Sequence, residues 1–337
     1  MISTNKSKHC SILALLLLIP GLAWAHVKWF VPVDEGPGSA FVPYSLHDQA
    51  VIVWIVISLF LVAFSVFLDS RLPSIPIVDS RARRNIVAIL RFCTGMSLLL
   101  TAYEGSVVAP HYIMEGSLGV ALLVLAGLIG ILLMSNHFLF QTSALMLILF
   151  AGLVVKLGFI ETIEYWNFIG IALFLMFNNF KSEKNIARFK PYSVPALRIF
   201  TGIALITLGL TEKLLGAEYG EAFIAQYQWN FMPGLGFENY SDRLFVLSAG
   251  FMEVVFGTIL ILGTTTRLNV LVVSGFMLTS NITFLVQGHN DAALMELVGH
   301  LPIITTAIIC IFFGYGQRMK VTSLFKRDQA TRQPETA

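Results

Sequence analysis

The chain has 337 residues, of which 56% are hydrophobic and 12% charged, and its mean hydropathy is +0.77. A soluble domain carries about twice that charged fraction, which excludes a soluble globular protein. The formal net charge is only +2, and most lysines and arginines lie in short connectors between apolar blocks. The sequence therefore offers no basic face for nucleic acid.

The first 25 residues have the pattern of a cleavable signal peptide. Lys6 and Lys8 precede a short apolar run, and Ala23-Trp24-Ala25 is a small-x-small cleavage site. Cleavage there leaves His26 as the mature N-terminus outside the cytoplasm, followed by a periplasmic arm over 26–49. An uncleaved first helix is the alternative, which the short apolar run disfavours.

Nine apolar blocks follow, close to the length of about 18 or more residues that crosses a bilayer core. They lie at about 50–68, 86–108, 117–134, 138–155, 164–180, 194–215, 244–262, 268–286 and 300–316. The sequence thus predicts an all-α, polytopic protein whose main partner is the lipid bilayer. The block at 164–180 is the weakest, because it is short and begins beside Glu161 and Glu164.

The distribution of positive charge predicts the orientation. With the mature N-terminus outside, the cytoplasmic connectors and the tail at 317–337 hold fourteen lysines and arginines, and the outer segments hold three. The positive-inside rule favours this orientation over the inverted one. We therefore expect a bacterial inner-membrane protein with a periplasmic mature N-terminus and a cytoplasmic C-terminus.

Two parts of the chain resemble each other. Leu90-Arg91-Phe-Cys-Thr-Gly95 matches Leu197-Arg198-Ile-Phe-Thr-Gly202 at an offset of 107 residues, and an acid follows each near the outer helix end, Glu104 and Glu212. Further similarities link Gly130-Ile-Leu-Leu with Gly257-Thr-Ile-Leu and, loosely, Glu161–Phe168 with Glu296–Ile303.

These matches predict a duplication. A prefixed helix and its cytoplasmic loop occupy 50–85, and two tandem four-helix units follow at 86–180 and 194–316. Both units have the same orientation, so this is a parallel repeat with its pseudo-axis along the membrane normal. An accidental match between apolar sequences is the alternative.

The second unit carries short family motifs. Arg198 and Gly202 open its first helix, Gly209-Leu-Thr-Glu-Lys213 closes it, and Glu253 in the next helix precedes Leu262-Gly-Thr-Thr-Thr-Arg267. In these motifs, over about 195–316, the sequence resembles the DoxX/DoxD-like family of four-helix membrane units. The resemblance implies a membrane protein linked to respiratory or redox processes, and the best-known members form part of a thiosulfate:quinone oxidoreductase.

Ionisable residues inside the hydrocarbon region usually face a bundle interior and mark functional positions. We expect a site near the outer face of the second unit, with the residues Glu253, Glu212, Lys213, Glu296, His300 and Arg198. Glu253 is the candidate proton acceptor for quinone or substrate chemistry. The alternative is that Arg198 or Lys213 neutralises it to fix helix packing. For Arg198 itself, snorkelling to the interface is the simpler expectation.

Metal binding has weaker support in the sequence. Glu296 and His300 share a helical face, but their spacing matches no recognised ligand signature, so no metal site is predicted. A terminal His26 would combine an amine and an imidazole, a pair that suits Cu(II), with a plain periplasmic arm as the alternative. The aromatic-rich outer loop at 217–243 is either a membrane belt or a lid over a quinone-like ligand.

Three classes of function remain open. The first is a redox-associated subunit or quinone-interacting partner in respiratory or sulfur metabolism, with a redox partner subunit and a quinone as a diffusible substrate. The second is a membrane transporter or a metal-handling, copper-binding protein, and the third is a membrane anchor for a soluble redox partner. The sequence has no Cys-x-x-Cys, so redox chemistry requires a diffusible substrate or partner. Whether the chain is itself an enzyme stays open.

Overall fold

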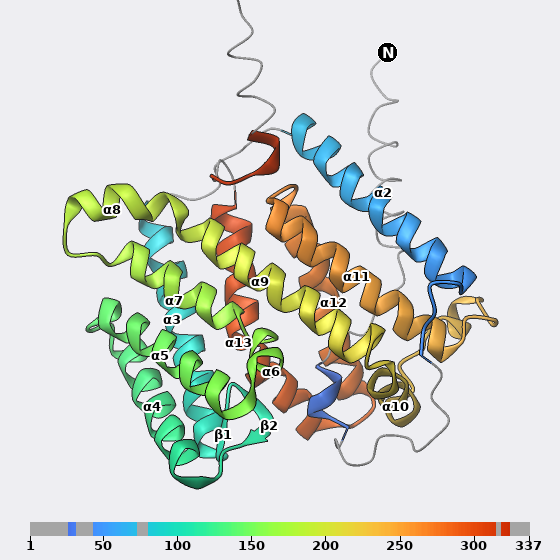
Figure 1. Ribbon diagram of the computed structural model, residues 1–337, viewed down its shortest axis with the longest axis horizontal. Helices are drawn as coiled ribbons and strands as arrows, with labels where there is room; N and C mark the ends of the chain where they lie inside the picture. Colours follow the sequence, from blue (N-terminus) through green and yellow to red (C-terminus); the bar gives the residue numbers. More distant parts are fainter. Residues whose placement is uncertain (1–25, 32–42, 73–79, 315–317, 324–337) are drawn as a thin grey trace, which may run out of the picture.

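The computed structural model describes residues 26–31, 43–72, 80–314 and 318–323. The predicted signal peptide at 1–25 lies outside this range. Within it, eight helices are long and apolar enough to cross a membrane, and the apolar helix Asn167–Asn178 is shorter. The prediction of an all-α, polytopic membrane protein is confirmed, with one short strand pair added (Figure 1).

The α-helices are, in chain order, α2 (Gln49–Arg71), α3 (Ser80–Tyr103), α4 (Gly116–Ser135), α5 (Leu139–Leu157), α6 (Phe159–Ile163), α7 (Asn167–Asn178), α8 (Glu183–Phe189), α9 (Ser193–Gly209), α10 (Ala217–Tyr227), α11 (Asp242–Leu262), α12 (Thr266–Val286) and α13 (Asn290–Phe313). The short elements are η1 (Val27–Trp29), the antiparallel strands β1 (Ser106–Val107) and β2 (Ala109–Ile113), η3 (Lys190–Tyr192), the π-helical turn η4 (Leu210–Leu214) and η5 (Pro233–Leu235).

Three predicted spans differ from the helices observed. The span expected to reach residue 108 ends at Tyr103, because Gly105 has a φ of 80° and the chain turns into the strand pair. The weak span at 164–180 contains only the short helix α7; a separate short helix, α6, precedes it, and Glu164 lies between the two. The last helix begins at Asn290 rather than at 300, and its first turns bury one face, with Ala293 and Glu296, while Asn290 and Asp291 are exposed.

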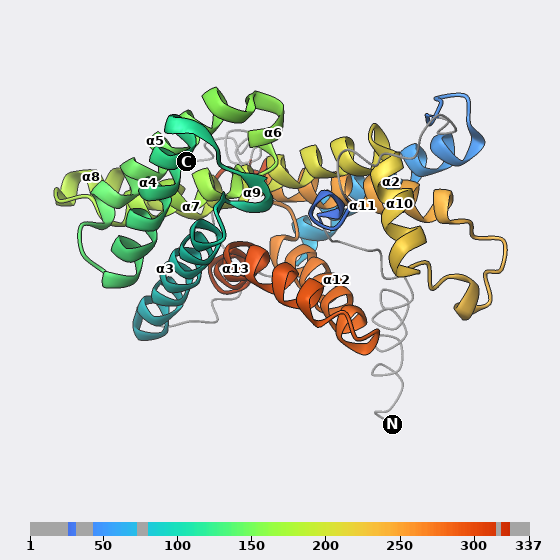
Figure 2. The same cartoon turned by 90° about the horizontal axis from the view of Figure 1, so that it is seen from below.

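The two predicted units pack against each other reciprocally. In the first unit α3 packs on α4, and in the second α9 packs on α11. The last helix of each unit then packs on the first helix of the other, α7 on α9 and α13 on α3 (Figures 1 and 2). Helix α2 lies along α11 at the edge of the bundle.

Matched contacts occur in the two units. A Cβ atom on Gly95 would lie 2.7 Å from the carbonyl oxygen of Gly130, and one on Gly202 would lie 2.6 Å from that of Gly257. In the first unit Arg91 Nη1 donates to the carbonyl of Leu133 at 2.8 Å, three residues after its glycine. Arg198 donates to the carbonyl of Leu260 in the same relation. This correspondence supports the predicted duplication, which stays a prediction.

The N-terminal segment 26–31 differs from the solvated arm that we expected. Val27, Trp29, Phe30 and Val31 are buried in the main hydrophobic core. The Phe30 ring lies 5.0 Å from that of Phe284, measured between centroids. The segment is docked in the bundle because its apolar side chains gain more from burial than from solvent exposure.

Candidate functional site

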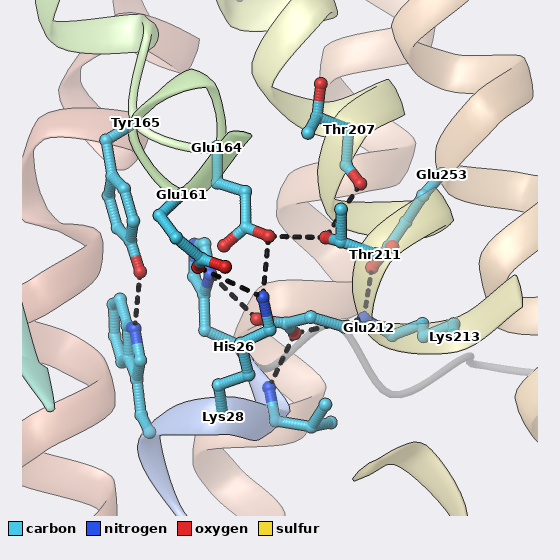
Figure 3. Close-up of polar contacts among 12 residues, drawn as sticks. His26, Lys28, Glu161, Glu164, Tyr165, Thr207, Thr211, Glu212, Lys213 and Glu253 are labelled. Carbon is cyan, nitrogen blue, oxygen red and sulfur yellow. Dashed lines mark hydrogen bonds and ion pairs between the residues drawn. The ribbon is translucent and has the colours of Figure 1, made fainter. Parts of the chain in front are cut away.

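A group of charged and polar side chains gathers where η1, α6, η4 and α11 meet, at the end of the bundle that the charge distribution predicts to face the periplasm (Figure 3). We call this the outer end. The group, here named the polar cluster, consists of His26, Lys28, Glu161, Glu164, Thr211, Glu212, Lys213 and Glu253.

Lys213 and Glu253 form the innermost ion pair of the polar cluster. Lys213 Nζ lies 2.9 Å from Glu253 Oε1, and the two side chains are 2% and 0% exposed. Gly209 allows this approach, because a Cβ atom there would lie 2.9 Å from the Cβ of Glu253. Of the two partners predicted for Glu253, the structure selects Lys213. An ion pair buried this deeply depends on both members, since removing one leaves the other charge uncompensated.

Glu212 lies on the other side of Lys213. Its Oε2 accepts the backbone N–H of Val27 at 2.8 Å and lies 3.9 Å from Lys213 Nζ. Its Oε1 lies 3.7 Å from His26 Nδ1 and accepts no hydrogen bond from the described residues. Both charged side chains are placed by local helix geometry, since the π turn η4 carries Glu212 and Lys213, and such turns recur at functional sites.

Glu164 joins the polar cluster from the junction of α6 and α7. Its Oε1 lies 2.8 Å from Lys28 Nζ and also accepts the Thr211 hydroxyl. Burial, and next the charge of Glu212, raise the pKa of Glu164 to about 7. Glu164 can therefore take up and release a proton near neutral pH.

Lys28 links the polar cluster to the outer surface. Its Nζ lies 3.6 Å from Glu161 Oε2, a carboxylate that is 43% exposed and also accepts the Tyr112 hydroxyl at 2.7 Å. Burial lowers the pKa of Lys28, but Glu164, Glu212 and Glu161 together outweigh that effect and raise it overall. Lys28 stays protonated across the physiological range.

The imidazole of His26 is enclosed by rings. It stacks on Trp29 at 4.4 Å, on Tyr165 at 5.4 Å and on His300 at 5.5 Å between centroids. The Trp29 indole N–H donates to the Tyr165 hydroxyl at 3.1 Å. Burial, reinforced by the charge of Lys213, holds the pKa of His26 well below its usual value, so the ring is neutral.

His300 and Glu296 lie on one face of α13, as their spacing predicts. The carboxylate of Glu296 lies 4.0 Å from His300 Nδ1 and accepts the Ser280 hydroxyl at 2.6 Å. His300 stacks on His26 and thereby connects this pair to the polar cluster. Five of the six predicted site residues are thus brought into one region.

Arg198, the sixth, lies elsewhere. It is fully buried. Its guanidinium donates to the carbonyl of Ile261, in the last turn of α11, at 2.6 Å and to that of Met319, which follows α13. Snorkelling to the interface is therefore not observed. The C-terminal carbonyls of a helix lack intrahelical donors, and Arg198 satisfies them. Its separation from Glu253 follows from the length of α9, which carries Arg198 near one end and leads to Lys213 at the other.

The sequence-based site omits several members of the polar cluster. Lys28, Glu161, Glu164 and Thr211 were not among the predicted residues, although Glu161 and Glu164 mark the weak span. A buried acid that interrupts an apolar block is the signal that points to Glu164. No pattern near Lys28 indicates that its short segment docks among helices.

Two cavities border the polar cluster. The first, of about 70 Å³, lies between α9, α12 and α13, and its lining is mainly apolar with hydroxyl and amide groups among it; His26, Glu164 and His300 also line it. The second, of about 450 Å³, is lined by Lys28, His111, Tyr112, Glu161 and Tyr219 among others and lies on the outer side. Members of the polar cluster thus line both a mainly apolar cavity and an outer one.

The described residues form no preformed metal site. Within the part of the chain that the structure describes, no group of three or more His, Cys, Asp and Glu side chains is arranged to hold a metal ion. Burial also lowers the pKa of His111, to about 4, and keeps that imidazole neutral in the outer cavity.

Comparison with known proteins supplies one match. The DoxX family model matches residues 194–287, a segment that contains Arg198, Glu212, Lys213 and Glu253 but not His26, Glu164 or His300. Neither a curated protein nor a solved structure matches the chain. Residues 194–287 are therefore similar to the DoxX family, and the rest of the chain has no match among known proteins.

Proposed function

We propose that this protein is a redox-associated inner-membrane protein that binds a quinone in the apolar cavity between α9, α12 and α13. The observation that carries the proposal is the lining of that cavity: mainly apolar side chains, together with the ionisable groups of His26, Glu164 and His300. Binding sites for small apolar ligands combine such a lining with a few convergent polar groups.

The cavity suits a quinone in access as well as in lining. Leu205, Val273 and Met277 border it and are only partly buried, so it is reached from a surface that the bilayer covers. Its volume of about 70 Å³ is several times the roughly 15 Å³ that one water molecule needs. We assign the headgroup to His26, Glu164 and His300 and the isoprenoid tail to the lipid-facing side.

The ionisable groups that line the cavity provide proton exchange. Reduction of a quinone to a quinol takes two electrons and two protons, and oxidation returns them. Glu164, with a pKa of about 7, is suited to accept or donate one of these protons. Lys28 and Glu161 continue from Glu164 toward the outer cavity. The electrons are exchanged with a redox partner protein or a small reductant, because the sequence contains no Cys-x-x-Cys.

The test uses two neighbouring positions on α12. Ser274 lines the cavity, whereas Gly275 is exposed and a Cβ atom there meets nothing within 4 Å. In nanodiscs, Ser274→Phe should weaken binding of a decyl-tailed benzoquinone by at least about tenfold, because the ring fills the cavity. Gly275→Phe should bind as the unaltered protein does. Equal affinity for all three proteins would refute quinone binding at this cavity.

A further inference from the structure

The polar cluster contains more buried carboxylates than buried ammonium groups. Glu164, Glu212 and Glu253 are 3%, 0% and 0% exposed. Lys28 Nζ lies 2.8 Å from Glu164, and Lys213 Nζ lies 2.9 Å from Glu253. Among the described residues, the lysine in closest contact with Glu212 is Lys213 at 3.9 Å, which Glu253 already engages, and Lys28 acts on Glu212 only through its charge at longer range. A buried carboxylate without a close cation is unfavourable, so a positive charge directly beside Glu212 would stabilise it.

The imidazole of His26 does not supply that charge. Burial and the neighbouring Lys213 keep the ring neutral, and His26 Nδ1 makes no hydrogen bond to the described residues. Glu212 Oε1 likewise accepts no hydrogen bond from them. The backbone beside His26 is a second position from which a cation can reach Glu212, because the Val27 N–H already donates to it.

The backbone N–H of Val27 points toward Glu212 and donates to its Oε2 at 2.8 Å. The α-nitrogen of His26 is one residue earlier, separated from the Val27 nitrogen only by the Cα and carbonyl carbons of His26. Ala23-Trp24-Ala25, the predicted cleavage site, ends directly before His26. Hydrolysis of the Ala25–His26 bond consumes one water, leaves a carboxylate on Ala25 and turns this amide nitrogen into an α-ammonium.

We propose that removal of the signal peptide creates a buried α-ammonium on His26 that pairs with Glu212 and completes the polar cluster. Cleavage replaces the uncharged amide of His26 by an ammonium beside Glu212, the carboxylate without a close cation. His26 and Val27 are each only 2% exposed, so cleavage precedes docking of the segment 26–31. Processing is thereby a requirement for assembly of the site. This inference rests on cleavage after Ala25 and is independent of quinone binding.

The first experiment uses the unaltered protein purified from membranes. Intact mass spectrometry should give a chain that begins at His26. An amine-acylating reagent should modify the α-amine of the folded protein at least about tenfold more slowly than that of the unfolded protein, because the amine is exposed only by local opening. A chain that retains residues 1–25, or an α-amine that reacts equally fast in both states, would overturn the proposal.

The second experiment moves the charge. Insertion of one alanine between Ala25 and His26 shifts the ammonium away from Glu212 and should lower the melting temperature. Adding Glu212→Gln should restore it, because the carboxylate without a cation is then gone. Glu104→Gln, at an exposed acid near the outer end of α3, is the matched control and should restore nothing. An insertion that leaves the melting temperature unchanged contradicts the proposal, and so does an equal recovery with Glu212→Gln and Glu104→Gln. If the chain with the inserted alanine does not fold, the acylation rates of the first experiment decide.

Discussion

Gly202 of α9 lies against Gly257 of α11 so closely that a Cβ atom on either would come within 2.6 Å of the carbonyl oxygen of the other. Gly95 and Gly130 make the corresponding contact between α3 and α4. Small residues let the backbones of membrane helices approach, and packing then supplies much of the stability. The crossing of α9 and α11 also sets the distance between Lys213, on the turn η4 that follows α9, and Glu253 on α11.

Gly202→Ala should destabilise the protein because the added methyl group meets backbone atoms that cannot rotate away. The expected loss is about 1–3 kcal/mol, the usual effect of overpacking. Gly127→Ala in α4 is the control, since a Cβ atom there meets nothing within 4 Å. Reversible unfolding in mixed micelles would measure both. Equal stability of the two variants would show that the crossing is not tightly packed.

Lys213→Met should cost about 3–5 kcal/mol, because it leaves the buried Glu253 carboxylate without its close cation. The double variant Lys213→Met, Glu253→Leu should recover much of that loss, since both charges are removed. If redox function depends on this pair, Glu253→Gln should also abolish substrate-dependent quinone reduction in membranes. Full quinone reduction by Glu253→Gln would limit Glu253 to helix packing.

Glu164 predicts a specific dependence of stability on pH. Its pKa in the folded protein is about 7, above the ordinary value of 4.5 in an unfolded chain. The folded state therefore binds this proton more tightly, and its contribution to stability is full below about pH 4.5 and is lost as the pH rises through 7. Glu164→Gln should remove this contribution. The difference in melting temperature between Glu164→Gln and the unaltered protein should grow from pH 5 to pH 8, and a constant difference would contradict the assignment.

The orientation can be tested with two exposed positions. Gly234 lies in the predicted outer loop, and Ser135 lies at the predicted cytoplasmic turn between α4 and α5. After replacement of Cys93 and Cys310, Gly234→Cys should react with a membrane-impermeant maleimide on spheroplasts, and Ser135→Cys only after lysis. The reverse pattern would invert the topology and place the polar cluster on the cytoplasmic side.

The helices were largely predictable from the sequence, and the contacts of the site were not. Uninterrupted apolar blocks mark membrane helices by length alone, and the spacing of Glu296 and His300 places them on one face. Lys28 and Glu164, by contrast, are 136 residues apart, and Val27 and Glu212 are 185 residues apart. Such contacts depend on how helices and a docked segment pack together, which no local periodicity encodes.

For Arg198, the sequence located the residue on its helix but did not predict its partner. An arginine near the end of a membrane helix suggests snorkelling or a charged partner, and the sequence offered Arg198 as one of two possible partners of Glu253. The structure instead pairs the guanidinium with helix-terminal carbonyls. Arg91 has a matching role at Leu133, so the contact is a property of each unit rather than of the polar cluster. Sequence pattern locates a charged residue along a helix, but its partner depends on which helix end it meets.

Gly299 provides a test of the docked N-terminal segment. A Cβ atom on Gly299 would lie 2.3 Å from the Trp29 ring. Gly299→Val should therefore displace Trp29, break its bond to Tyr165 and release the Val27 N–H from Glu212. Hydrogen exchange followed by mass spectrometry should show exchange at 27–31 at least about tenfold faster than in the unaltered protein. Gly275→Val, on the open side of α12, should leave that exchange unchanged. If residues 27–31 are protected equally in both variants, the contact with α13 does not hold the segment. That contact then does not position the neutral ring of His26 either.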